Sequence, residues 1–351
     1  MKLIAACTGL LLGVGALYPS ATLAESLNQP VADPLDRPAM ARSDIGTAML
    51  AGVSGNDDYV VAVGERGWIF VRKLSEEEWA QAEVPVSVLL TNVAVEDGNN
   101  VWAVGHSGVI LHSKDGGKRW TKQLDGNDLA MLMARSASTP EAEQDAEYLV
   151  AEGADKPLFD IAYNRAGANM LAVGAYGMAL KLDRSEDEWE AIKYELPNPM
   201  GAHLYDIDVF NESVLIAGEM GLILFSEDKG ETFESIVSPY EGSFFGGCLL
   251  SETSFLVFGL NGNVFHTGDA GENWQNLELG TEASITACAV TRDQVILTGQ
   301  SGEIFHSADH GRTFRGVEIN ADAPILDLLP LEEEKVLVVG MRGKQIIEVA
   351  K

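Results

Sequence analysis

The sequence predicts an all-β protein, a seven-bladed β-propeller with four-stranded blades and a small helical insertion between blades 2 and 3. Two observations carry this prediction. A Gly-x-x-Gly pattern follows an apolar run seven times, and an aromatic residue recurs at a fixed distance after it. Repeats of about 40 residues with four short strands each are typical of propeller blades. We therefore expect a single propeller domain over residues 37–351.

The Gly-x-x-Gly pairs predict a hairpin in every repeat. The apolar run before each pair does not alternate with polar residues, which indicates a strand buried on both faces. A second apolar run follows, and glycine supplies the positive φ that a tight connection needs. The pairs are Gly64/Gly67, Gly105/Gly108, Gly174/Gly177, Gly218/Gly221, Gly259/Gly262, Gly299/Gly302 and Gly340/Gly343.

Four repeats also carry the pattern Ser/Thr-x-Asp-x-Gly-x-x-Trp/Phe, known as the Asp-box or BNR motif. Its carboxylate can accept backbone N–H groups in a turn between the third and fourth strands, and its aromatic can fill the gap between strands. We therefore expect a structural role. The four boxes contain Asp115 and Trp120, Asp228 and Phe233, Asp269 and Trp274, and Asp309 and Phe314.

The seventh repeat predicts how the ring closes. Its aromatic position would fall beyond Lys351, so this repeat lacks a fourth strand of its own. The equivalent position before the first repeat is Pro38. We expect Arg37–Ser43 to supply the missing strand, because a closed ring hides open sheet edges. Residues 25–36 are largely polar and contain two prolines, which indicates a flexible leader.

One repeat junction carries an insertion, Asp125–Pro157. Residues 129–134 favour a helix. Thr139 followed by Pro140 and acidic residues is a typical helix start, so we expect a second helix to about Glu152. The insertion is expected on the face of the Gly-x-x-Gly turns, either as a lid over the junction or as a docking element.

The N-terminus predicts export. Lys2 precedes an apolar run through Leu17, and Thr22-Leu23-Ala24 offers small residues for cleavage, so residues 1–24 resemble a signal peptide. We expect a periplasmic protein cleaved near Ala24. No later segment is apolar enough to insert into a membrane. The net charge of −29 disfavours nucleic acid and anionic lipid as partners and favours a soluble monomer.

The cysteines and histidines do not indicate a metal site or a cofactor. Cys248 and Cys288 occupy equivalent positions on the first strands of blades 5 and 6, and we expect two separate buried thiols. His112, His266 and His306 share one repeat position in three blades, which favours packing over metal binding.

Several stretches resemble the photosystem II stability/assembly factor-like family of BNR propellers. They are Val84–Ser87, Val101–Gly108, His112–Trp120 and Lys122–Gly126. The resemblance implies a non-catalytic assembly or accessory factor that docks on a membrane protein or envelope complex, such as an exporter or an assembly intermediate. Photosynthetic members are expected to dock through an Arg-rich patch. The stretches above are similar to those of the bacterial, non-photosynthetic members, and the absence of an Arg cluster from this sequence favours a membrane partner other than a photosystem.

The alternative function is a glycoside hydrolase or carbohydrate-binding propeller, since many of these carry Asp-boxes. Sialidase-like chemistry needs three arginines around one carboxylate, and the arginines here do not recur at one repeat position. A pair of catalytic carboxylates remains open in a chain with 53 acidic residues. We predict a non-catalytic protein.

The Gly-x-x-Gly face is the predicted partner-binding surface. Its connections between blades are rich in aromatics and prolines, and aromatics and arginines dominate interface hot spots. The alternative is ordinary loop packing over the channel. The candidate residues are Arg66, His106, Tyr176, His203, Tyr205, Tyr240, Phe244, Phe245 and Arg342.

Overall fold

The computed structural model describes residues 32–42, 44–183, 187–291, 294–318, 323–332 and 334–349. Contacts separate a compact unit, Pro34–Lys351, from Met1–Asp33. The expected signal peptide, residues 25–31 of the expected leader and Ser43 lie outside the described residues. The compact unit is the propeller.

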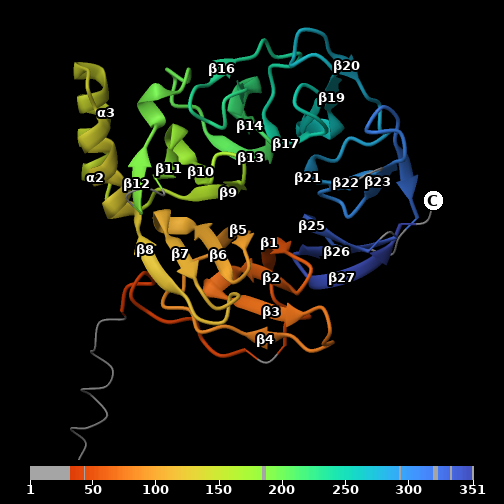
Figure 1. Cartoon of the computed structure of the whole chain (residues 1–351), viewed down its shortest axis with the longest axis horizontal. Helices are drawn as coiled ribbons and strands as arrows, with labels where there is room; N and C mark the ends of the chain where they lie inside the picture. The colour runs from red at the N-terminus through yellow and green to blue at the C-terminus, as the bar shows by residue number, and fades with distance from the viewer. Residues whose placement is uncertain are drawn as a thin grey trace, which may run out of the picture. The chain divides into compact units, whose positions relative to one another are not determined.

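Seven antiparallel sheets follow one another around a ring (Figure 1), which confirms the seven-bladed propeller. Within the described residues six sheets have four strands, and the seventh has three. Blades 1 to 3 contain β1 (Leu50–Gly55), β2 (Tyr59–Gly64), β3 (Ile69–Lys73), β4 (Ala80–Gln81); β5 (Leu90–Asp97), β6 (Asn100–Gly105), β7 (Ile110–Ser113), β8 (Thr121–Leu124); and β9 (Leu158–Asn164), β10 (Asn169–Gly174), β11 (Ala179–Asp183), β12 (Glu188–Ala191).

The remaining blades repeat this order, with the first strand of each blade lining the centre of the ring. Blades 4 to 7 contain β13 (Leu204–Phe210), β14 (Ser213–Gly218), β15 (Ile223–Ser226), β16 (Glu234–Ser235); β17 (Phe244–Leu249), β18 (Phe255–Gly259), β19 (Val264–Thr267), β20 (Gln275–Asn276); β21 (Ile285–Val290), β22 (Val295–Gly299), β23 (Ile304–Ser307), β24 (Arg315–Val317); and β25 (Ile325–Glu332), β26 (Lys335–Gly340), β27 (Gly343–Glu348).

The second strand of each blade forms the core. Every residue of β2, β10 and β14 is buried, as the non-alternating apolar runs predicted. Side chains from adjacent blades then form one apolar cluster at each of the seven junctions. The Gly-x-x-Gly turns are short 3-10 turns in blades 1 to 5. The stability of the ring therefore comes largely from packing between blades.

The insertion is a helical hairpin of α2 (Gly126–Ser136) and α3 (Pro140–Ala151), as predicted. Asp125 caps α2 in a reciprocal capping box, and the Thr139 hydroxyl accepts the backbone N–H of Ala142 at the start of α3. Leu129 and Met133 are fully buried against blades 2 and 3. In the described part of the chain no helix has the length and apolar character to cross a bilayer.

The expected closing strand at Arg37–Ser43 is not confirmed. Its described residues form no strand, and they hydrogen-bond to blade 1 and the connection after it instead of to blade 7. Ala39 N donates to Val84 O at 3.0 Å, and the Met40 carbonyl accepts from the Trp68 indole at 3.1 Å. Leu35, within the expected leader, is 7% exposed and packs in the cluster between blades 1 and 2.

Candidate functional site

Every first strand has a β-bulge at its second residue, at the Gly-x-x-Gly end. A bulge re-aims the side chain at that point. The seven bulge residues all line one end of the central channel, which we call the channel mouth. They are Ala51, Thr91, Phe159, Tyr205, Phe245, Thr286 and Leu326.

The aromatic bulge residues belong to a continuous set of rings over blades 3 to 5, which we call the aromatic row: Tyr176, His203, Phe159, Tyr205 and Phe245. Ring centroids are 5.4 Å apart for Tyr176 and His203, 6.1 Å for His203 and Tyr205, and 5.7 Å for Tyr205 and Phe245. Phe159 lies 5.6 Å from Tyr205. These separations suit mutually supporting ring contacts.

The row begins beside the helical insertion. Tyr176 stands at the tip of the blade 3 hairpin with a φ of 58°, and its backbone N–H donates to His203 Nδ1 at 2.9 Å. The Tyr176 carbonyl accepts from Lys193 Nζ at 2.6 Å, and this ammonium lies 3.0 Å from the Asp145 carboxylate on α3. The insertion is thus fixed to the blade that presents Tyr176.

Exposed apolar side chains border the row on the same face. Tyr148 of α3 is 59% exposed. Its pKa is raised by its hydrogen bond to Glu152 and, more weakly, by the nearby Tyr176. Met200, in the connection from blade 3 to blade 4, and Met220, at the tip of the blade 4 hairpin, are also exposed. Together with the row they form an apolar strip from the insertion to the channel mouth.

Eight of the nine predicted partner-binding residues fall into three groups. Tyr176, His203, Tyr205 and Phe245 come together in the aromatic row. Arg66, His106 and Arg342 are exposed at hairpin tips on blades 1, 2 and 7, outside the row. Tyr240 is half-buried, with its ring stacked on Phe265 at 6.1 Å.

The prediction for Phe244 is wrong. Phe244 is fully buried in the cluster between blades 4 and 5, so a partner has no access to it. The bulge explains the difference, because it turns Phe245 to the channel while Phe244 points into the core. Phe159, which the sequence reasoning missed, occupies the same bulge position in blade 3. The signal was present as an aromatic–Asp pair that recurs in register, Phe159-Asp160 and Tyr205-Asp206.

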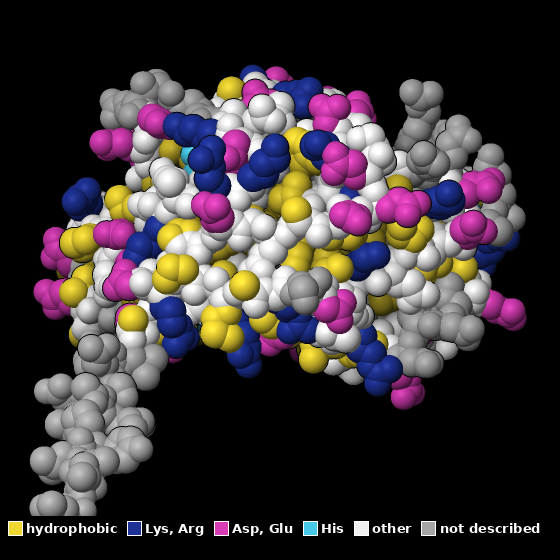
Figure 2. Space-filling model, turned by 90° about the horizontal axis from the view of Figure 1, so that it is seen from below, with side chains coloured by type: hydrophobic (Ala, Val, Ile, Leu, Met, Phe, Trp, Pro, Cys, Tyr) yellow, Lys and Arg dark blue, Asp and Glu magenta, His cyan; other side chains and the backbone are white. Residues whose placement is uncertain are grey.

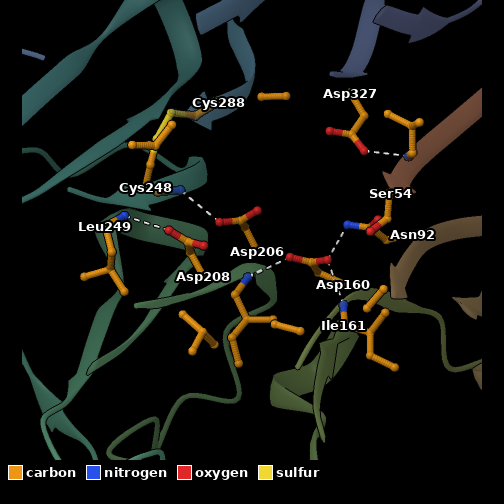
Figure 3. Close-up of a pocket in the computed structure, with 18 of the residues that line it drawn as sticks. Ser54, Asn92, Asp160, Ile161, Asp206, Asp208, Cys248, Leu249, Cys288 and Asp327 are labelled. Atoms are coloured by element: carbon orange, nitrogen blue, oxygen red, sulfur yellow. Dashed lines mark hydrogen bonds between the residues drawn. A yellow bond between two sulfur atoms is a disulfide. The ribbon is translucent and has the colours of Figure 1, made fainter. Parts of the chain in front are cut away.

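Below the mouth, the channel has a volume of about 970 Å³ and contains four aspartates, Asp160, Asp206, Asp208 and Asp327 (Figure 3). Asp160 is 5% exposed, and the others are half-buried. Burial raises the pKa of all four carboxyls, to about 6 for Asp208 and about 7 for Asp327. The neighbouring Asp160 carboxyl raises the pKa of Asp206 further.

Each of these carboxyls holds the first strand of the next blade. Asp160 accepts the backbone N–H of Ile207 at 2.8 Å, Asp206 that of Gly247 at 2.9 Å, and Asp208 that of Leu249 at 2.7 Å. In the same way Asp327 of blade 7 accepts the backbone N–H of Val53 in blade 1 at 2.7 Å. This side chain therefore links the last blade to the first, together with the apolar cluster at the same junction.

The other junctions have side-chain links as well. The Asn92 amide of blade 2 donates to Asp160 of blade 3, and Thr91 Oγ1 donates to the Leu158 carbonyl at 2.8 Å. Ser54 Oγ accepts from Val95 N at 3.3 Å between blades 1 and 2. Between blades 6 and 7, Thr286 Oγ1 donates to the Ile325 carbonyl at 2.8 Å.

Cys248 and Cys288 form a disulfide between blades 5 and 6, so the expectation of two separate thiols is wrong. The two cysteines lie on neighbouring first strands, which converge toward the channel. Their Cα atoms are consequently 6.3 Å apart, within bridging range. This bond is the covalent counterpart of the carboxyl links at the adjacent junction.

The Asp-boxes form the predicted turns at the opposite end of the blades. In each box one carboxylate oxygen accepts backbone N–H groups, as Asp228 does from Thr232 at 2.8 Å. The hydrogen bond from the Thr313 hydroxyl, together with the backbone N–H groups, holds the pKa of Asp309 at about 2, against the opposing effect of burial. Among the described residues no three His, Cys, Asp or Glu side chains are grouped to hold a metal ion.

The three histidines pack in the blades. The His112 ring stacks on Trp102 at 3.7 Å, and His266 hydrogen-bonds to Ser254 Oγ at 3.0 Å. Burial lowers the pKa of His112 to about 4.

On the side of the ring seen in Figure 2, basic, acidic and apolar side chains are interspersed.

The chain is similar to known proteins in part of its sequence and in its fold. Residues 49–152 match the model of a family described as photosynthesis system II assembly factor YCF48. No curated protein shows a significant sequence match to the chain. The structure titled YCF48 bound to D1 peptide is 15% identical, with a TM-score of 0.64 over 87% of this chain and 95% of that one.

Two further solved structures share the fold. YCF48 from Cyanidioschyzon merolae is 13% identical, with a TM-score of 0.62 over 86% of this chain and 95% of that one. The WD40 propeller domain of Doa1 is 10% identical, with a TM-score of 0.61 over 91% and 97%. These likenesses show the propeller fold, and the family model adds the kind of repeat. The chain is thus a seven-bladed β-propeller, similar over residues 49–152 to the photosystem II assembly factor family of BNR-repeat proteins.

Proposed function

We propose that this protein is an exported, non-catalytic binding factor that docks on a membrane protein or envelope complex through its Gly-x-x-Gly face. The observation that carries the proposal is the apolar strip, which runs from the helical insertion along the aromatic row to the channel mouth. Half-exposed aromatic side chains with little rotamer freedom are typical anchors of protein interfaces. On this proposal the insertion is a docking element rather than a lid.

The related propellers support a protein partner. One of them is YCF48 bound to D1 peptide, which shows that a propeller of this kind holds a peptide. In this chain Met200 and Met220 extend the strip with adaptable apolar side chains, which suit a peptide segment of varied shape. The lack of an Arg-rich stretch in the sequence indicates a partner other than a photosystem.

The disulfide supports export to the periplasm. Disulfides persist in oxidising compartments and are rare in the cytosol. The Cys248–Cys288 bond therefore agrees with the signal peptide expected at residues 1–24. We propose that the mature protein works there as a monomer, without a cofactor.

The channel carboxyls argue against a glycosidase. A glycosidase needs a pair of carboxyl groups that are free to act on the sugar, and Asp160 and Asp206 are neighbouring carboxyls in the channel. Each of them also accepts a backbone N–H from the next blade. A group committed to these bonds is poorly placed to attack a sugar or to transfer protons.

The test is site-specific photo-crosslinking of the full-length protein in envelopes of its own cell. A photoreactive phenylalanine analogue replaces Tyr176 on the proposed face or, as the control, the exposed Glu227 in an Asp-box turn at the opposite end. We expect one envelope protein to be crosslinked from position 176 and not from 227, and Tyr205→Ala to weaken that crosslink.

Two results would contradict the proposal. Crosslinking of the same protein from position 227 alone would move the docking surface to the other end of the propeller. Hydrolysis of glycosides that is lost on Asp160→Asn would make the protein an enzyme.

A further inference from the structure

The channel mouth combines two kinds of side chain in register. Phe159, Tyr205 and Phe245 stand side by side on the first strands of blades 3, 4 and 5. Asp160 and Asp206 follow the first two of these aromatics directly in the sequence, one residue deeper in the channel. The mouth is therefore an aromatic wall above a pair of carboxyl groups.

This part of the channel has no basic side chain of its own. Among the described residues that line the channel the one Lys or Arg is Arg165, which follows β9 at the opposite end. His310, the one lining histidine in that part of the chain, belongs to an Asp-box turn at that same end. The acids at the mouth thus face each other, backbone N–H groups and the Asn92 amide, with no Lys or Arg among the described lining residues of this end.

We propose that the channel mouth takes up one cationic group, the guanidinium or ammonium of a basic residue in the docking segment of a protein partner. The inference rests on the proposed function and adds the chemistry of the partner. The faces of Phe159, Tyr205 and Phe245 contact the alkyl stem and the cation, and Asp160 and Asp206 receive its N–H groups. Aromatic faces attract such cations, and charged hydrogen bonds to carboxylates are the stronger kind.

Charge complementarity selects this occupant over an apolar or acidic one. The chain carries a net charge of −29, so an acidic segment is repelled from the whole surface. An apolar side chain would pack against the rings but would leave the carboxyls of Asp160 and Asp206 without a counter-charge. A basic side chain can contact the aromatic rings with its alkyl stem and pair with the carboxyl groups through its charged end.

The carboxyl links allow the charge to be removed without loss of the fold. Asp206 binds Gly247 N through a single oxygen, Oδ2, at 2.9 Å. In Asp206→Asn the amide oxygen still accepts this N–H, while the negative charge and its repulsion with Asp160 are gone. We expect the variant to be at least as stable as the wild type. A loss of binding in this variant would then report the charge and not unfolding.

The experiment uses three capped synthetic peptides of one length, with a central residue flanked by leucine and alanine. The central residue is arginine, its uncharged isostere citrulline, or glutamate. Calorimetric titration into the full-length protein should show binding of the arginine peptide, with citrulline about tenfold weaker. Asp206→Asn should weaken the arginine peptide about fivefold or more and leave the citrulline peptide unchanged. Asp228→Asn, which removes one charge at the opposite end, should change neither.

Equal affinity for arginine and citrulline, or an unchanged arginine affinity in Asp206→Asn, would overturn the inference. So would the absence of arginine-peptide binding at millimolar concentration. If all three peptides bind alike and Tyr205→Ala abolishes their binding, the proposed docking face stands while the cation site fails. If the envelope partner crosslinks only from position 227, the docking face itself fails.

Discussion

The carboxylate of Asp327 accepts the backbone N–H of Val53 at 2.7 Å, which joins the last blade to the first across 274 residues of sequence. The other carboxylate oxygen accepts Leu328 N at 2.7 Å. One side chain therefore satisfies two backbone donors at the junction where the chain closes on itself.

Removal of this acceptor should destabilise the ring. Asp327→Ala leaves the N–H groups of Val53 and Leu328 without their partner, and we expect a loss of about 1–3 kcal/mol in the free energy of unfolding. Asp327→Asn keeps an acceptor oxygen and serves as the control. Urea unfolding of both variants checks this. Equal stability of the two would show that the bond to Val53 does not hold the junction.

The same residue should give stability a pH dependence. The pKa of Asp327 is about 7 in the folded chain against 3.8 in the unfolded one. The folded state thus binds the proton more tightly, and the stability that this proton contributes is lost as pH rises from about 4 to about 7. His112, whose pKa is lowered to about 4, makes the folded state less stable as pH falls below 6.5. Because His112 is present in both the wild type and Asp327→Asn, the difference in stability between the two isolates the effect of Asp327. The stability of Asp327→Asn relative to wild type should rise between about pH 4 and pH 7 in urea unfolding series, and parallel curves would refute it.

The disulfide between blades 5 and 6 should contribute to stability through the 40 residues that separate its cysteines. Replacement of both Cys248 and Cys288 by alanine should lower the free energy of unfolding by about 2–4 kcal/mol. Thermal unfolding with and without a reductant measures this. The reductant should lower the Tm of the wild type alone, and a matching shift in the variant would point to another cause.

Phe244 and Phe245 should behave in opposite ways, although they are adjacent. Phe244→Ala opens a cavity in a fully buried cluster and should cost about 3–5 kcal/mol of stability. Phe245→Ala removes a ring from the channel mouth and should weaken partner binding by about 1–3 kcal/mol with a smaller loss of stability. Denaturation and crosslinking yield are compared for the pair. A reversed pattern would show that the bulge orients the two rings differently.

This pair also shows what the sequence could and could not predict. The repeat of Gly-x-x-Gly and the Asp-boxes predicted the number of blades, the buried second strands and the place of the helices. The directions in which the Phe244 and Phe245 side chains point depend on a β-bulge, because a bulge shifts the alternation of side chains along the strand by one residue. No strong sequence pattern indicates where such a bulge lies. The orientation of these two rings therefore follows from the three-dimensional structure and not from the sequence pattern.

The junction at blade 7 and the cysteines depended on geometry in the same way. The absent fourth strand suggested an N-terminal replacement, but Asp327 and the apolar clusters close the ring without one in the described residues. Cys248 and Cys288 stand 40 residues apart at equivalent repeat positions, and only the convergence of the first strands brings their Cα atoms within 6.3 Å. In the sequence the four channel aspartates do not stand out among 53 acidic residues. Only the arrangement of the first strands around the channel brings them together.

The disulfide has a consequence for the integrity of the molecule. Blades 5 and 6 are connected by an exposed segment that includes Gly280. A protease that cuts after Gly280 leaves Cys248 in one fragment and Cys288 in the other, so the two fragments remain one covalent molecule. While the disulfide is intact, the propeller thus tolerates a nick in this connection, and the C-terminal blades separate only after the bond is reduced.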